Sequence, residues 1–253
     1  MRLITIPVSH YCEKARWALD RAGLLYREER HLQMFHRLPL LRLGGLRTVP
    51  VAVTPEGVLA DSHAILDYAD ARLPDAERLY PSAIRDRVLD WERRLDDDFG
   101  VEARRLFYDQ LIRAPRRFVL AFNNARAPAW QQVAFGLGLP AARAFLVRYL
   151  EINEASLARA RERVQGTLDE VAAALGDGRP FLCGDRFTAA DLTFASLSAP
   201  VSAPAEYGPG MPALGEFPPE TQRYLQAYAE HPAVRFARHL YTSERHRVAR
   251  GPE

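Results

Sequence analysis

The segment LITIPVSHYC (residues 3–12) decides the fold, because it joins an apolar, strand-like run directly to a segment with helical spacing. We predict a buried strand over residues 2–6 and a helix over residues 11–22 that ends at Gly23. A strand that leads straight into a helix leaves unpaired backbone N–H groups and a partial positive charge near Ser9. We therefore expect a thiolate or another anion to bind there.

The segments that follow complete a small mixed sheet. Residues 26–31 and 48–53 are predicted strands, and the turn TPEG (residues 54–57) has the Pro and Gly positions of a type I turn that leads into the fourth strand of the domain at 58–60. Asp61-Ser62 then offers the cap of a helix that continues through Leu73. The predicted order is β-α-β-(α)-β-β-α.

The rest of the chain is predicted to be helical. We divide the whole chain into an α/β domain at 1–75, a linker at 76–84 and an all-helical domain at 85–253. Proline and glycine make 113–140 less regular, so that segment is either a lid or an elaborate helix connection. The predicted helices are 83–110, 141–175, 189–200 and 219–238.

Composition excludes several classes of function. The 34 basic and 32 acidic residues are interspersed, so we predict no nucleic-acid partner. We find no secretory signal and no membrane span, and the two cysteines, Cys12 and Cys183, make a poor disulfide framework, so we expect a cytoplasmic protein. The scarcity of lysine is typical of a GC-rich bacterial genome. The basic run at 245–250 is predicted to be a solvated tail rather than a phosphate-binding element.

Two motifs in the first domain allow a structural or a functional interpretation. Pro50 either only opens a strand or forms a cis bond that turns the backbone of Val49 toward a peptide-like ligand. Asp61 and Ser62 either only cap a helix, or hold both ends of an amino-acid moiety: Ser62 its carboxylate and Asp61 its ammonium group.

A third motif lies in the helical domain. Thr188 and Asp191 have the spacing of a capping box at the start of an apolar helix. We predict a structural role for this pair, because it satisfies helix-start donors at a buried position.

These motifs occur in an order that resembles the cytosolic glutathione transferases, in particular the bacterial, serine-type, theta-like members. The resemblance rests on Ser9-x-x-Cys12, Val49-Pro50, the stretch at 61–66 and the stretch at 184–191. It implies a thioredoxin-like amino-terminal domain followed by an all-α domain. It also implies glutathione as co-substrate, no metal, a small electrophile as second substrate, and a homodimer.

The resemblance also assigns residues to the glutathione site. Ser9 would donate a hydrogen bond to the glutathione sulfur and favour its thiolate, with Tyr11 nearby. Thr48, Val49 and Pro50 would border the cysteinyl backbone, and Asp61 and Ser62 would hold the γ-glutamyl end. Where many members have Gly-Lys or Gly-Gln, this chain has Arg47-Thr48. Whether Arg47, Arg42 or His36 then binds the glycyl carboxylate stays open.

Residues other than Ser9 could also contact the glutathione sulfur. Tyr11 could replace Ser9, and His10 is predicted to shape the mouth of the site. Cys12 would allow thiol–disulfide chemistry, but its spacing with Ala15 and Leu19 predicts a buried apolar position.

The second substrate is expected between the first domain and residues 95–125. His10, Arg104, Arg105 and Tyr108 are the candidate pocket residues, and the two adjacent arginines indicate an anionic electrophile. The leading hypothesis is a glutathione transferase, with peroxidase, reductive dehalogenase and lyase variants open. The alternatives are a non-catalytic glutathione-binding module and a glutathione-dependent thiol–disulfide oxidoreductase that uses Cys12.

Overall fold

The computed structural model describes residues 1–123 and 127–249. A four-stranded sheet forms the amino-terminal part, with the strand order β2-β1-β3-β4. β1 pairs in parallel with β2, and β3 is antiparallel to both β1 and β4. In chain order this part contains β1 (Arg2–Thr5), α1 (His10–Arg21), β2 (Arg27–Arg30), α2 (Arg37–Leu41), β3 (Val51–Thr54), β4 (Gly57–Leu59) and α3 (Ser62–Asp70). The predicted order of elements is confirmed.

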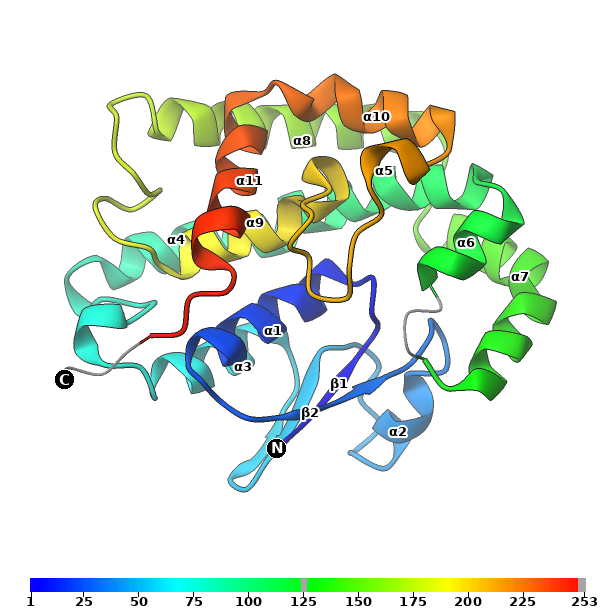
Figure 1. Cartoon of the computed structure of the whole chain (residues 1–253), viewed down its shortest axis with the longest axis horizontal. Coiled ribbons are helices and arrows are strands. Elements are labelled where there is room, and N and C mark those ends of the chain that lie inside the picture. Colours follow the sequence, from blue (N-terminus) through cyan, green and yellow to red (C-terminus); the bar gives the residue numbers. More distant parts are fainter. Residues whose placement is uncertain (124–126, 250–253) are drawn as a thin grey trace.

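Strand alternation sends side chains to two faces of this sheet. Leu3 and Ala52 belong to the core beneath α1 and α3, whereas Ile4 and Val51 pack with Leu40 of α2. The sheet is therefore covered on both faces, and α1 lies between it and the remaining helices (Figure 1).

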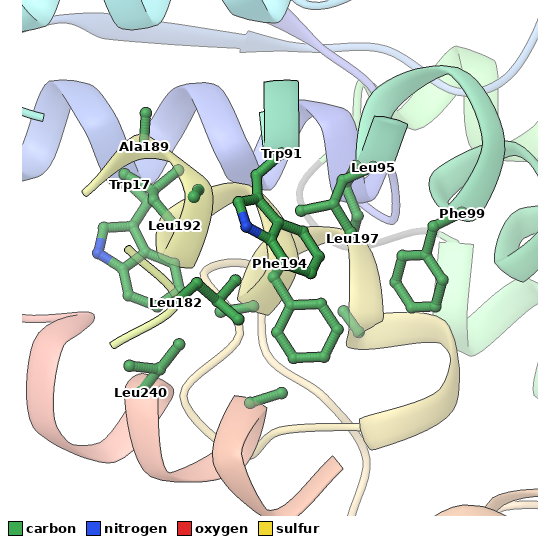
Figure 2. Close-up of a cluster of buried hydrophobic side chains, with 14 of the residues drawn as sticks. Trp17, Trp91, Leu95, Phe99, Leu182, Ala189, Leu192, Phe194, Leu197 and Leu240 are labelled. Carbon is green, nitrogen blue, oxygen red and sulfur yellow. The ribbon is translucent and has the colours of Figure 1, made fainter. Parts of the chain in front are cut away.

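The remaining helices form one body around α9. In chain order they are α4 (Arg85–Arg94), a π-helical turn at Leu95–Phe99, α5 (Gly100–Arg113), α6 (Arg116–Asn123), α7 (Ala129–Tyr149), α8 (Glu154–Ala174), α9 (Ala189–Ser202), α10 (Pro219–Ala229) and α11 (Pro232–Glu244). All residues of α9 are buried. Figure 2 shows Leu192 and Phe194 of α9 among Trp17 of α1, Trp91 of α4 and Leu240 of α11. The mixed sheet followed by helices is the predicted fold class.

Two predicted helices and one predicted irregular segment differ from the structure. The predicted helix 141–175 breaks between α7 and α8, where Glu151 has a positive φ and Asn153 caps α8. The predicted helix 219–238 breaks before Pro232, which occupies the first turn of α11. The predicted irregular segment 113–140 is mostly α6 and α7. Pro140 is tolerated inside α7, whose Phe135 and Leu139 are buried in a cluster with Leu32 of the first part.

The basic run near the carboxyl end is only partly solvated, because His246 and Arg247 are exposed but Arg245 is buried. The guanidinium of Arg245 donates to Glu13 at 2.7 Å and to Asp20 at 2.9 Å. The N–H of Ala249 donates to the carbonyl of Arg21 at 2.9 Å. The buried carboxylate of Glu13 and the partly exposed one of Asp20 hold this segment against α1, which the sequence run alone did not reveal. Arg250 lies outside the described residues.

A buried ion cluster joins α1 to α4. Lys14, the single lysine of the chain, donates to Glu92 at 2.8 Å and to Asp96 at 2.6 Å. Glu92 also accepts from Tyr80 at 2.7 Å and from His63 at 3.1 Å. These contacts fix α1, which begins at the site described below, relative to the helical body.

No single helix in the described ranges is long and apolar enough to cross a membrane. Only α7 and α8 taken together, which are bent by 68°, meet that test of length and composition.

Candidate functional site

A cavity of about 420 Å³ lies between the sheet part and the helical body. Its first wall comes from the β1–α1 turn, the loop after β2, the turn before β3 and the start of α3. Its second wall comes from the π-helical turn at Leu95–Phe99, from α5 and from α7.

Ser9 occupies the N-cap of α1 and lines the cavity. Its backbone is extended, and its hydroxyl oxygen accepts from the N–H of Cys12 at 3.4 Å. This bond uses a lone pair of the oxygen. No oxygen or nitrogen acceptor for the hydroxyl proton occurs among the described residues, and the Cys12 thiol, a weak hydrogen-bonding group, is the side-chain partner within its reach. Ser9 can therefore donate a hydrogen bond to an anion at the positive end of α1.

His10 is buried and neutral. Its Nε2 lies 3.0 Å from the carbonyl oxygen of Gly100, so Nε2 carries the proton. Burial, with a smaller contribution from the charge of Arg104, lowers the pKa of His10 to about 3. His10 therefore lines the cavity as a neutral group.

The Tyr11 hydroxyl is engaged with the helical body. It donates to the carbonyl oxygen of Asp96 at 2.6 Å, and burial raises its pKa. A β-carbon at Gly100 would lie 2.7 Å from this hydroxyl, so only glycine fits at the start of α5. Tyr11 borders the cavity, but its proton already has an acceptor.

The turn before β3 presents backbone groups. The Val49–Pro50 peptide bond is cis, as the ligand-binding interpretation of Pro50 required. Thr48, Val49 and Pro50 all line the cavity. Val49 precedes β3, and within the described residues its N–H and C=O form no backbone hydrogen bond. They are free to pair with an extended peptide.

The start of α3 presents a cap and an open helix end. Asp61 is the N-cap and accepts from the N–H of Ala64 at 2.8 Å, which confirms its structural role. Asp61, Ser62 and His63 line the cavity.

His63 is also hydrogen-bonded to Glu92 of α4. Burial by itself would raise the pKa of Glu92, but hydrogen bonds from His63 and Lys14 lower it to about 2. Glu92 in turn raises the pKa of His63.

Basic residues occur at the end of the cavity near Thr48. Arg37 and Arg47 line it, both are exposed, and neither has an ion-pair partner in the described ranges. His36 lies there too, but it contacts the carbonyl oxygen of Arg47 at 3.2 Å, and burial lowers its pKa. Arg42 is not among the lining residues. The sequence did not single out Arg37, because its role depends on where the loop after β2 folds.

The second wall is mainly aromatic and apolar, with one cation and the carboxylates of Asp96 and Asp97. Arg104 and Tyr108 come from α5. Phe145, Leu146 and Tyr149 come from α7, a helix that was not expected to contribute. Arg105 does not line the cavity, which corrects its assignment to the pocket. Its guanidinium binds Glu102 and donates to the carbonyl of Leu150 at 2.9 Å.

Two family models match the chain. The amino-terminal domain of glutathione S-transferases matches residues 3–77, and their carboxyl-terminal domain matches residues 154–227. The chain belongs to the glutathione S-transferase family. No curated protein sequence matches it significantly.

Solved glutathione S-transferases share its fold. One from Xanthobacter autotrophicus Py2 superposes with a TM-score of 0.60 at 19% identity, over 96% of this chain and 92% of that one. A theta class glutathione S-transferase from Xanthomonas axonopodis pv. citri, with glutathione bound, gives a TM-score of 0.56 at 23% identity, over 92% and 94% of the two chains. One from Methylobacterium radiotolerans, in complex with glutathione sulfonate, gives 0.52 at 21% identity, over 100% and 97%. At these identities the likeness concerns the fold alone.

The remaining candidate residues of this member of the family lie in the core. Cys12 is fully buried, and burial raises the pKa of its thiol, so its environment is that of a packed side chain rather than a reactive thiolate. Asp191 accepts from both the N–H and the hydroxyl of Thr188, each at 2.9 Å, and from the N–H of Leu182 at 2.8 Å. Burial raises the pKa of Asp191 to about 6. The capping box is confirmed as structural.

Proposed function

We propose that the protein is a glutathione transferase in which Ser9 stabilises the glutathione thiolate. The observation that carries this proposal is the Ser9 hydroxyl, which lines the cavity at the start of α1 and has only the weakly hydrogen-bonding thiol of Cys12 as a competing partner for its proton within the described residues. The donor and the helix dipole both favour the ionised sulfur. A tripeptide thiol with the ordinary pKa of cysteine, about 8.5, would thus be ionised to a larger extent at neutral pH.

The rest of the first wall matches the chemistry of glutathione. The free backbone groups of Val49 would pair with the cysteinyl residue in the manner of an added strand. The N–H and hydroxyl of Ser62 at the start of α3 would hold the γ-glutamyl carboxylate, and Asp61 its ammonium group. Arg37 and Arg47 would attract the glycyl carboxylate in place of the missing lysine.

The reaction would be a nucleophilic substitution or addition. The thiolate sulfur forms a bond to an electrophilic carbon in the second half of the cavity. In a substitution, the leaving group departs with the electron pair of the broken bond. The homodimer and the cytoplasmic location expected from the resemblance stay predictions.

Substitution of Ser9 tests the proposal. We expect Ser9→Ala to lower kcat/KM with 1-chloro-2,4-dinitrobenzene about 100-fold, as for loss of one oriented donor to a developing or stabilised anion. Ser9→Thr, which keeps a hydroxyl, should restore most of the activity. Titration of the bound thiol by ultraviolet absorbance should show a higher pKa in Ser9→Ala, while calorimetry shows glutathione binding within about threefold of wild type.

A second variant controls for the lost helix cap. Asn153 caps α8 by accepting from the N–H of Ser156 at 3.0 Å, and it does not itself line the cavity. Asn153→Ala should cost about 1 kcal/mol of stability, comparable to the cap lost in Ser9→Ala, with activity unchanged. Unchanged turnover in Ser9→Ala would refute the role of Ser9. Tight glutathione binding without turnover of any electrophile would instead favour a binding module.

A further inference from the structure

Arg104 differs from every other arginine that the structure describes. Each of the others that is buried or half-buried has a carboxylate or carbonyl partner, and those without a partner are exposed. Arg104 is half-buried, yet it has neither an ion pair nor a hydrogen bond within the described residues, and its Nε is buried without an acceptor. The neighbouring Arg105 shows the ordinary situation, because Glu102 and a carbonyl satisfy it.

No group around Arg104 supplies the missing anion. His10 is neutral, and the hydroxyl of Tyr108 is contacted weakly by Gln33, at 3.4 Å. Asp96 lines the same cavity but is paired with Lys14 at 2.6 Å. Asp97 also lines the cavity, but it is exposed and forms no ion pair with Arg104. An unpaired guanidinium with a buried N–H is costly, and a carboxylate is the acceptor that matches its two parallel N–H groups.

The cavity beside Arg104 is apolar. Phe145, Leu146 and Tyr149 of α7 face it from the second wall, together with Tyr108 of α5. These side chains suit an aromatic or aliphatic body rather than a second peptide. The combination of one free guanidinium with an apolar wall specifies a molecule that is apolar at one end and anionic at the other.

Given the proposed transferase function, we propose that Arg104 binds a carboxylate of the second substrate, so that the preferred electrophiles are apolar carboxylic acids rather than neutral compounds. The two carboxylates of glutathione have other partners, at the start of α3 and near Thr48, on the opposite wall. Arg104 is thus a specificity-determining residue. It acts on the electrophile and not on the tripeptide.

A matched pair of electrophiles tests the inference. In 4-chloro-3,5-dinitrobenzoate and its methyl ester, the thiolate forms a bond to the carbon that bears chlorine, and chloride leaves with the electron pair of the C–Cl bond. We expect wild-type protein to prefer the acid by about tenfold or more in kcat/KM, and Arg104→Gln to abolish that preference. Any effect of Arg104 on the thiolate is common to both compounds and cancels in this ratio.

A control variant separates a local contact from a general change of charge. Arg148→Gln removes the same charge from an exposed position on α7 that does not line the cavity. It should keep the preference for the acid. The Kd of glutathione should be unchanged in Arg104→Gln.

A binding measurement keeps the inference testable without turnover. Protein saturated with S-methylglutathione is titrated with 3,5-dinitrobenzoate and with its methyl ester, neither of which has a leaving group. If wild type binds the acid more tightly than the ester, and Arg104→Gln loses this difference, the inference is supported even if no electrophile reacts. The absence of any reaction would count only against the transferase proposal. Equal binding of acid and ester by wild type, or a higher Kd of glutathione in Arg104→Gln, would overturn the inference.

Discussion

The wall of the cavity built by the sheet part and the wall built by α5 and α7 offer different kinds of groups. The first wall presents the cap hydroxyl of Ser9, the free backbone of Val49 and the open end of α3 at Ser62. The second wall presents side chains, with Arg104 as its cation. Groups held in place by the backbone suit a ligand that is the same in every reaction. The side chains of the second wall can instead be substituted without disturbing the fold, which suits a variable substrate.

The two walls are also held in place differently. Ion pairs anchor the first wall, since Lys14 on α1 is buried against Glu92 and Asp96. Apolar packing and amide contacts join the loop after β2 to α6 and α7, since Gln33 donates to Asn123 of α6 at 2.6 Å and the N–H of Leu32 donates to Gln131 of α7 at 2.9 Å. Variants of the shared framework should therefore affect the whole protein, and variants of one wall should affect one substrate.

The largest effect is expected from Glu92→Gln. Glu92 is buried and accepts from Lys14, Tyr80 and His63, so removing its charge leaves Lys14 with a single partner. We expect a loss of about 3 kcal/mol in the free energy of unfolding at pH 7, measured by urea denaturation. Glu162→Gln, at an exposed position on α8, should stay within about 0.5 kcal/mol of wild type.

The same variant predicts a pH dependence. The folded protein lowers the pKa of Glu92 to about 2, against an ordinary value of 4.5. The stability that this carboxylate contributes is therefore fully present above about pH 4.5 and is lost as the pH falls toward 2. The difference in unfolding free energy between wild type and Glu92→Gln should shrink over that range. A constant difference would show that the ion cluster does not anchor the first wall.

Gly100→Ala should have the next largest effect. The added β-carbon would lie 2.7 Å from the Tyr11 hydroxyl and 2.9 Å from Leu197, at the junction of the two walls. We expect a loss of about 2 kcal/mol in thermal or chemical denaturation. Gly136→Ala, whose β-carbon would find its nearest neighbour at 3.6 Å, should be neutral or stabilising by up to about 1 kcal/mol. Adding Tyr11→Phe to Gly100→Ala should recover part of the loss, and strict additivity would argue against this contact.

Arg37→Gln and Arg47→Gln should change one substrate only. Because both side chains are exposed, we expect each to raise the Kd of glutathione by only about three- to tenfold, less so at high salt. Calorimetry at two ionic strengths measures this effect. Arg42→Gln, at a residue that does not line the cavity, is the matched control. A change in the preference between acidic and neutral electrophiles would mean that the walls are not independent.

Tyr11→Phe should have the smallest effect on turnover. Its hydroxyl donates to the carbonyl of Asp96, so we expect kcat/KM to change by less than about threefold. Steady-state kinetics beside Ser9→Ala provides the comparison. A loss as large as that of Ser9→Ala would assign the sulfur to Tyr11 and return Ser9 to a purely capping role.

Sequence patterns predicted some features of individual residues correctly and did not predict others. The spacing of Cys12, Ala15 and Leu19 predicted a buried helix face, and all three are fully buried. Thr188 and Asp191 form the predicted capping box. By contrast, the adjacent Arg104 and Arg105 look equivalent in sequence. Only the position of Glu102 and the Leu150 carbonyl makes one of them satisfied and the other free.

The basic run at 245–250 illustrates the same limit. Its composition indicated solvent exposure, because isolated charges are costly to bury. Two carboxylates on α1, the buried Glu13 and the partly exposed Asp20, lie more than 200 residues away in sequence and make the burial of Arg245 favourable.

The amino-acid sequence alone determined the groups whose geometry is local: the caps at Ser9, Asp61 and Thr188, the order of strands and helices, and hence the fold and the first wall of the cavity. Capping and strand alternation depend on residues within a few positions of one another, so they are visible in a linear pattern. Only the tertiary structure decided which side chains from α5 and α7 face the cavity, that Tyr11 is already engaged, and that Arg104 has no partner in the part of the chain that the structure describes. Those properties depend on contacts between segments far apart in the chain, and such contacts leave no periodic signal in the sequence.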